Sequence, residues 1–211
     1  TGLAQTVPEH RRQGTAYRGP IIDVHAHLMF GREPLMGTRP HSPDDYLRLA
    51  GGLDARHVGA LVMARRSDLT KTRAQNDEVL GLARRTKGRF YAVCSVHPFD
   101  GPSALREVSR VASQGAKALK LHPNTQDFDV ADPRVKAVAA RAAKEGLPVL
   151  FDAYSPFDAD QPGKFVRLAM EVPLGRFILA HAHGPNFPDL LVYDILARYP
   201  WWKRNVWIDL S

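Results

Sequence analysis

The sequence has very little cysteine, since Cys94 is the single cysteine in 211 residues. One thiol excludes an internal disulfide, and it excludes zinc sites built on pairs of cysteines. This composition suits a reducing compartment, so we expect a cytoplasmic protein, although the mature form of an exported protein would look the same. Cys94 lies within an apolar run, so we expect it to be a buried core residue and not a catalytic nucleophile.

Long apolar runs and long runs of one charge are also absent. No stretch reaches the roughly 18 apolar residues of a membrane-spanning helix, so no membrane partner is expected. The net charge is +7, but the basic residues are scattered in pairs and form no motif for RNA or DNA. We therefore expect no nucleic acid as partner, and the positive balance favours a small acidic substrate. A homo-oligomer remains open.

The chain length suits one domain with one sizeable core. Residues 1–20 are polar and without period, which predicts a surface arm, and residues 21–211 form the predicted domain. Short apolar runs predict strands at Ile21–His27, Ala60–Ala64, Phe90–Val96, Ala116–His122, Pro148–Tyr154, Arg176–His183 and Asn205–Ser211. Helical spacing between them predicts helices at Pro43–Leu53, Lys71–Lys87, Pro102–Gln114, Pro133–Gly146, Gly163–Glu171 and Pro188–Tyr199.

Strand and helix alternate without a break, which predicts a parallel sheet in an α/β fold. Two architectures fit this order, an open doubly wound sheet and a TIM-type (β/α)8 barrel. A doubly wound sheet usually carries a glycine-rich phosphate turn after an early strand, and the sequence has none. Histidines or acids instead stand at the C-terminal ends of five predicted strands, and barrel active sites gather at that rim. The barrel is therefore favoured.

The stretch from Asp23 to His27 is the most informative one for chemistry. Side chains alternate along a strand, so His25 and His27 point to the same face and are close enough to share one ion. Two imidazoles supply half of a tetrahedral site for zinc or a similar divalent metal. The alternative is a pair of solvated or hydrogen-bonded histidines at the end of a strand.

Further histidines stand at other strand ends. His122 shares a face with Ala118 and Lys120, and this places it at the rim as a third ligand. His181 and His183 are expected to share a face of the sixth predicted strand in the same way. Catalytic metal sites usually have three protein ligands and a water, so His181 is assigned to hold or deprotonate that water.

Three motifs in order carry a family resemblance: Asp23 to His27, Lys120 to Pro123, and Ala180 to Pro188. Together they resemble the amidohydrolase-related family, which contains aminocarboxymuconate-semialdehyde decarboxylase, resorcylate-type decarboxylases and lactone hydrolases. The resemblance implies a (β/α)8 barrel with one divalent ion, often zinc. It implies His25, His27 and His122 as metal ligands and His181 as the catalytic histidine. The expected substrate is a small molecule that carries a carboxylate.

Two departures from the family pattern stand out. Asp152 occupies a strand end where many relatives have a histidine, so it is a candidate base, ligand or hydrogen-bond partner. The aspartate that the family carries on the eighth strand is absent, because the sequence stops after a segment that resembles the seventh strand. Asp209 does not match that aspartate and is not assigned as a ligand. We expect a missing native C-terminal segment; a partner chain that supplies the strand, or a degenerate barrel, are the alternatives.

Three residues are candidates for binding substrate: Arg65 after the second predicted strand, and His97 and Tyr154 at rim positions. Arg65 suits a carboxylate, because the guanidinium group binds one in a fork. The sequence therefore predicts a metal-dependent hydrolase that acts with activated water on an amide, ester or lactone. A nonoxidative decarboxylase of an aromatic or muconate-like acid is the first alternative, and a barrel that has lost catalysis is the second.

Overall fold

The computed structural model describes residues 21–28, 41–50 and 55–210, so the predicted arm lies outside the described residues. Its strands form one sheet in the order of the chain, and every neighbouring pair is parallel. The strands are β1 (Ile21–His27), β2 (Ala55–Leu61), β3 (Phe90–Ser95), β4 (Ala118–Leu121), β5 (Val149–Asp152), β6 (Phe177–Ala180) and β7 (Val206–Ile208).

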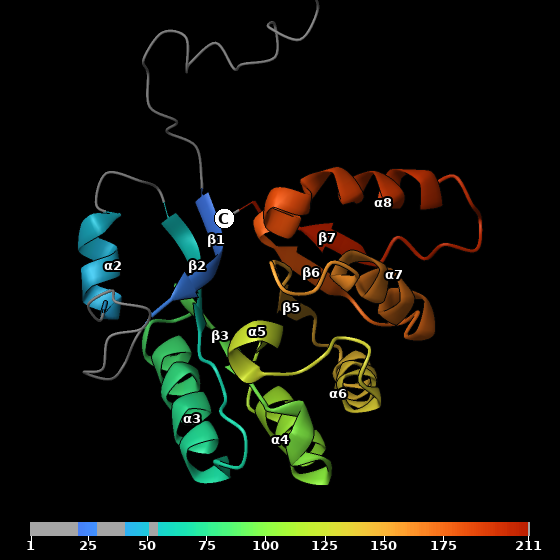
Figure 1. Ribbon diagram of the computed structural model, residues 1–211. Helices are drawn as coiled ribbons and strands as arrows, with labels where there is room; N and C mark the ends of the chain where they lie inside the picture. Colours follow the sequence, from blue (N-terminus) through green and yellow to red (C-terminus); the bar gives the residue numbers. More distant parts are fainter. Residues whose placement is uncertain (1–20, 29–40, 51–54, 211) are drawn as a thin grey trace, which may run out of the picture.

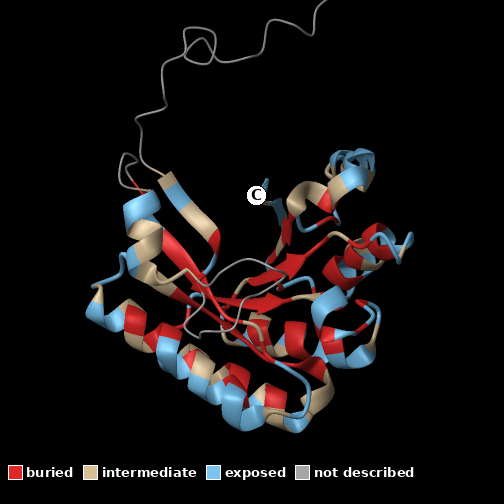
Figure 2. Cartoon of the chain, turned by 60° about the vertical axis from the view of Figure 1, so that its left-hand side comes forward, coloured by how far each residue is buried: buried red, intermediate tan, exposed pale blue. Residues whose placement is uncertain are grey.

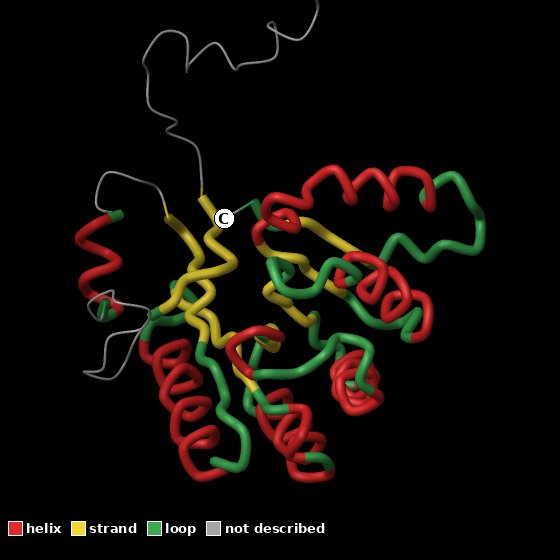
Figure 3. The backbone as a smooth tube through the Cα atoms, in the orientation of Figure 1, coloured by secondary structure: helices red, strands yellow, loops and turns green. Residues whose placement is uncertain are grey.

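The longer helices follow the strands and lie on the outside of the curled sheet (Figures 1 and 3). They are α2 (Pro43–Leu49), α3 (Leu69–Arg85), α4 (Pro102–Ser113), α5 (Pro123–Gln126), α6 (Pro133–Lys144), α7 (Gln161–Glu171) and α8 (Leu191–Leu196), with the 3-10 segments η2 (Pro98–Asp100) and η3 (His181–Leu190). Seven parallel strands curled in this way confirm the predicted TIM-type barrel, with no eighth strand among the described residues.

Local chemistry explains where the helices begin and end. The Asp132 side chain accepts a hydrogen bond from the backbone N–H of Arg134, and Pro133 occupies the first turn of α6. The chain leaves this helix through Gly146, whose φ of 73° is in the left-handed region that favours glycine. Capping residues in the sequence therefore predict this helix within two residues at its C-terminal end.

Two apolar layers hold the barrel together. Between the helices and the sheet, the core includes Val58, Leu119 and Phe151, all fully buried. Inside the curl, a smaller cluster fills the barrel: Leu61, Val93, Ala118, Leu150 and Ala180. The strands β3 to β6 are buried almost throughout (Figure 2). Burial on both faces explains why these strands are continuous apolar runs in the sequence.

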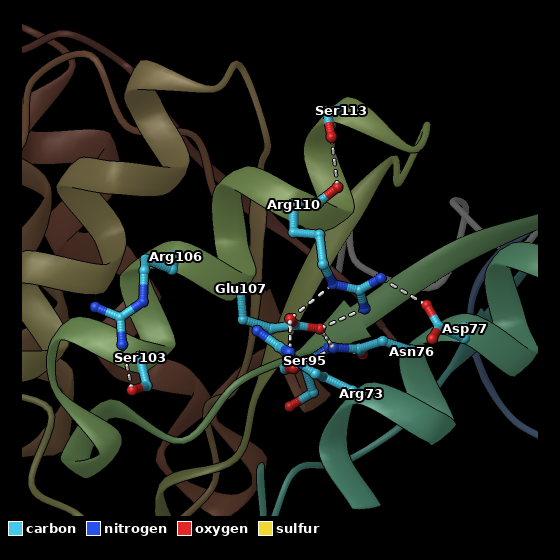
Figure 4. A network of polar contacts seen from close by, with 9 residues as sticks. All are labelled: Arg73, Asn76, Asp77, Ser95, Ser103, Arg106, Glu107, Arg110 and Ser113. Carbon is cyan, nitrogen blue, oxygen red and sulfur yellow. Dashed lines mark hydrogen bonds and ion pairs between the residues drawn. The ribbon is translucent and has the colours of Figure 1, made fainter. Parts of the chain in front are cut away.

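A buried polar network ties α3 and α4 to the sheet (Figure 4). The Asn76 side chain donates to the Glu107 carboxylate at 2.9 Å and pairs with both backbone groups of Ser95. The Ser95 hydroxyl in turn donates to the backbone carbonyl of Lys120 at 2.8 Å. Arg110 binds Glu107 through two nitrogens, at 2.7 and 2.8 Å, from the partly exposed side. The network thus reaches from the outer helices to a strand that carries the candidate site.

One part of the sequence prediction is wrong at the end of β6. His181 and His183 do not share the face of a strand, because β6 ends at Ala180 and the chain then turns. His181, Ala182 and His183 all have positive φ, at 62°, 46° and 61°. The Ala182 N–H donates to the carbonyl of Asp209 at 3.1 Å, a contact that no local pattern encodes. The two histidines therefore point to different surroundings.

Candidate active site

The first part of the site is the histidine pair of β1. The Nε2 atoms of His25 and His27 lie 3.2 Å apart. Two imidazoles that bind one ion at about 2.0–2.1 Å with a tetrahedral angle have this nitrogen separation. The His25 side chain is buried, whereas His27 is exposed to solvent. The pair matches the spacing that alternation along a strand predicts.

Lys120 of β4 and Asp209, directly after β7, contact the His25 ring. The Asp209 carboxylate accepts a hydrogen bond from His25 Nδ1 at 2.9 Å, and this leaves Nε2 directed at the site. The Lys120 ammonium lies 2.9 Å from His25 Nε2, and Lys120 is fully buried. Burial lowers the pKa of Lys120 to about 8, against the opposing effect of Asp152 and Asp209. A buried cation therefore stands beside the histidine pair.

The second part of the site is a carboxylate shared by two histidines. Asp152, the last residue of β5, lies with Oδ2 3.1 Å from His181 Nε2 and 3.4 Å from His122 Nε2. The His25 and His181 rings have their centroids 5.1 Å apart, which joins this part to the histidine pair. The structure thus brings together the five predicted residues from four strand ends: His25, His27, His122, Asp152 and His181.

The electrostatics of this cluster favour neutral histidines around an ionised carboxylate. Burial and the charge of Lys120 lower the pKa of His25 below its ordinary value. Burial also lowers the pKa of His122 to about 4, although Asp152 acts in the opposite direction. Burial alone would raise the pKa of Asp152, but the hydrogen bond from His181 and the positive charge of Lys120 keep this pKa low. Neutral imidazoles can bind a metal or accept a proton at neutral pH.

The donor set fits a divalent ion in part. Among residues 21–28, 41–50 and 55–210, no three His, Cys, Asp or Glu side chains converge in the geometry of a metal site. The spacing of His25 and His27 and the Asp209 contact on Nδ1 nevertheless suit an ion, because metal-bound histidines usually donate their other N–H to a carboxylate. The Lys120 ammonium would have to turn away from His25 for that ion to bind.

The remaining predicted residues lie around the cluster. His97 is buried, donating from Nε2 to the carbonyl of Gln126 at 2.7 Å and accepting at Nδ1 from a backbone N–H. Both of its ring nitrogens are therefore engaged with backbone groups, and the structure does not bring it into the cluster. Gln126 accepts from the N–H of His122, so His97 supports that residue indirectly. Arg65 is exposed after β2, and Tyr154 is half-buried beside Gly184.

Sequence reasoning missed two residues of this site as functional groups. Lys120 is a lysine within a strand of otherwise apolar residues, on the same face as His122, and that position was a signal. Asp209 is two positions after Trp207, which pairs with Ile178, a residue that packs against the inner cluster. No local feature could reveal its bond to His25, since the two residues are 184 positions apart.

Solved structures similar to this chain show the same fold. The 2,6-dihydroxybenzoate decarboxylase from Rhizobium is 15% identical, with a TM-score of 0.68, and the match covers 92% of this chain and 80% of that one. The 5-carboxyvanillate decarboxylase from Sphingomonas paucimobilis is 17% identical at a TM-score of 0.56, covering 78% of this chain and 62% of that one. A Pseudomonas putida protein with a provisional assignment as 2-pyrone-4,6-dicarboxylic acid hydrolase is 20% identical at a TM-score of 0.59, covering 89% and 67%.

The chain thus spans 62% of the length of the 5-carboxyvanillate decarboxylase that it resembles. No curated protein sequence matches it significantly. Within the described part of the chain, none of the helices has the length and apolar character needed to cross a membrane. The sequence model named Amidohydrolase matches residues 22–211, nearly the whole chain. Together with the barrel and its histidines, this match shows that the chain belongs to the amidohydrolase family.

Proposed function

We propose that this protein is a metal-dependent hydrolase that uses activated water to open an amide, ester or lactone of a small carboxylate substrate. The observation that carries the proposal is the arrangement of two groups side by side. A histidine pair has the nitrogen spacing of a shared ion, and a histidine–aspartate pair lies next to it. Such an arrangement provides a place for an ion and a base within one cluster.

Each residue has a role in this proposal. His25 and His27 would hold one divalent ion, with His122 as the third ligand. Imidazole binds several divalent metals, and zinc is our choice among them. When bound, such an ion supplies Lewis-acid polarisation of the substrate carbonyl and lowers the pKa of water. His181 donates from Nε2 to Asp152 and accepts the proton of the attacking water at Nδ1, and Asp152 stabilises the imidazolium that results.

The substrate side follows from charge. Lys120 places a buried ammonium beside the histidines, and a buried cation attracts an anionic group. Arg65 is exposed in the segment that follows β2, where a guanidinium could meet a carboxylate of an incoming substrate. Tyr154 would line the same rim. These groups support a small substrate that carries a carboxylate.

The test combines metal removal with substitution. Purified protein is assayed on a panel of lactones, esters and amides of small carboxylic acids, before and after chelation and after readdition of zinc or manganese. We expect turnover to require the ion, and His181→Ala to lower kcat by at least about 100-fold, as loss of a general base does. His57→Gln is the matched control, because His57 is exposed and bonds the carbonyl of Gly88, away from the cluster. Full activity without any divalent ion would refute the proposal.

A decarboxylase is the second candidate, and Lys120 is the observation that favours it. A buried ammonium next to His25 suits the carboxylate that such an enzyme removes. Two of the similar structures are decarboxylases of aromatic acids. Release of carbon dioxide from hydroxybenzoates and muconate-like acids, measured beside the hydrolysis panel, separates the two reactions. If His25→Ala and His181→Ala leave every measured turnover unchanged, the barrel is not catalytic through this site.

A further inference from the structure

The turn after β6 has an unusual backbone. Four consecutive residues, His181 to Gly184, have φ between 46° and 62°, and three of them are not glycine. L residues with side chains adopt this region rarely, and such strain persists only where the surroundings fix it. Gly184 must lack a side chain, because a Cβ there would lie 2.5 Å from the Tyr154 ring. The turn is therefore held in place by contacts with neighbouring elements.

His183 makes the most specific of these contacts. Its ring is 1% exposed, and Nδ1 lies 3.2 Å from the backbone carbonyl of Ala153. The ring is parallel to that of Tyr193 within 7°, with centroids 6.3 Å apart, and it also packs against Phe165. Its Nε2 has no hydrogen-bond partner within the described chain. The hydrogen bond to Ala153 is therefore the contact that depends on an imidazole at this position, because an apolar side chain could not form it.

The two histidines of the turn dock on two consecutive residues of the neighbouring strand end. His181 contacts the side chain of Asp152, and His183 contacts the carbonyl of Ala153, the next residue. One rigid turn therefore sets both distances at once. If the second contact is lost, the strained turn can relax, and the first distance changes with it.

We propose that His183 is a positioning residue, whose imidazole anchors the turn to Ala153 and so fixes His181 against Asp152. This inference rests on the proposed role of His181 in catalysis. His183 itself does not touch the reacting atoms, because it is buried between the turn and the helices α7 and α8. Its contribution is the placement of another residue.

Two substitutions separate this role from plain packing. His183→Asn tolerates positive φ and carries an amide donor near the position of Nδ1, but it loses the stacked ring. His183→Phe keeps a ring of similar size between Phe165 and Tyr193, but it has no donor. Tyr193→Phe is the matched control, since the buried Tyr193 hydroxyl has no hydrogen-bond partner among residues 21–28, 41–50 and 55–210, and the ring remains.

The measurements are Tm, kcat and KM, and the imidazole signals of His181 in long-range ¹H–¹⁵N NMR spectra. We expect His183→Phe to lower kcat by on the order of 100-fold, the effect of a misplacement of about 1 Å, with KM little changed and shifted His181 signals. His183→Asn should lower Tm more than His183→Phe does, yet keep the His181 signals and kcat closer to wild type. Tyr193→Phe should leave His181 unaltered.

A packing role predicts the reverse order, with His183→Phe active and His183→Asn impaired. Wild-type kcat and His181 signals in a folded His183→Phe protein would therefore overturn the inference, even if His183→Asn does not fold. The NMR comparison needs no substrate. If the wild-type protein turns over nothing on the panel, the proposed function fails, while the His181 signals still decide whether His183 positions that ring.

Discussion

What each histidine does depends on the groups that hold its two ring nitrogens. Asp209 holds Nδ1 of His25, backbone groups hold both nitrogens of His97, and Ala153 holds Nδ1 of His183. All three lie at or near the ends of predicted strands, so spacing in the sequence makes each of them an equally good candidate for the site. Spacing correctly brought His25 and His181 into one cluster. It could not separate His97 and His183 from that cluster, because their partners lie about 30 residues away.

The contact between Asp209 and His25 can be tested by a single substitution. Its carboxylate orients His25 and makes the imidazole a stronger ligand, so Asp209→Asn should weaken divalent-ion binding by about 10-fold or more. Isothermal titration with zinc or cobalt, after chelation, measures the affinity. Asp194→Asn is the control, because Asp194 forms an ion pair with Arg198 in which both side chains are 72% exposed. Equal ion affinity in Asp209→Asn and wild type would contradict the orienting role.

At the scale of elements, the sequence predicts those whose ends are set locally. The strand β1 and the start of α4 at Pro102 agree with the prediction, because alternation and a first-turn proline define them. Two strands differ. β2 begins at Ala55, where it pairs with Ile21, and β6 ends at Ala180, before the turn. Pairing with another strand and long-range hydrogen bonds set these ends, and neither leaves a local pattern.

The buried network around Glu107 joins α3 and α4, and its contribution to stability can be measured. Glu107 is 1% exposed and binds Asn76 and Arg110, so Glu107→Ala leaves buried polar groups without their partner. We expect the free energy of unfolding to fall by about 3 kcal/mol, measured by urea denaturation. Asp77→Asn, at the exposed end of Arg110, should cost less than about 1 kcal/mol. Equal losses in the two variants would show that burial of the network does not matter.

At the scale of the whole molecule, the sheet has two ends, β1 and β7, that pair with no further strand in the described chain. Ile22 and Ile208 are exposed on them, at 63% and 36%. Open edges with apolar side chains favour pairing with another chain. We expect self-association that rises with concentration and falls in Ile22→Lys, measured by light scattering after gel filtration. Leu174→Lys, at an 84% exposed leucine between α7 and β6, should not change it.

The buried histidines make the stability of the whole metal-free molecule depend on pH. The pKa of His122 is about 4 in the folded chain and near 6.5 when unfolded, so the unfolded state binds an extra proton between these values. The contribution of His122 to stability is therefore complete above about pH 6.5 and falls as the pH drops, by up to about 1.4 kcal/mol per pH unit. Lys120 acts only between its folded pKa of about 8 and its ordinary value of 10.5, outside this window.

Urea denaturation of chelated protein at pH 7, 6 and 5 measures this dependence. His122→Gln cannot take up the proton, so its stability should fall less steeply with acid, by about 1.4 kcal/mol per pH unit near pH 5. His57→Gln, at an exposed histidine, should keep the wild-type slope. Asp152 does not contribute to the slope between pH 5 and 7, because a carboxyl group whose pKa is lowered loses its contribution to stability only below its ordinary value of 3.8. Parallel slopes in His122→Gln and wild type would mean that His122 binds a proton equally well in the folded and the unfolded chain, so that the barrel does not lower its pKa.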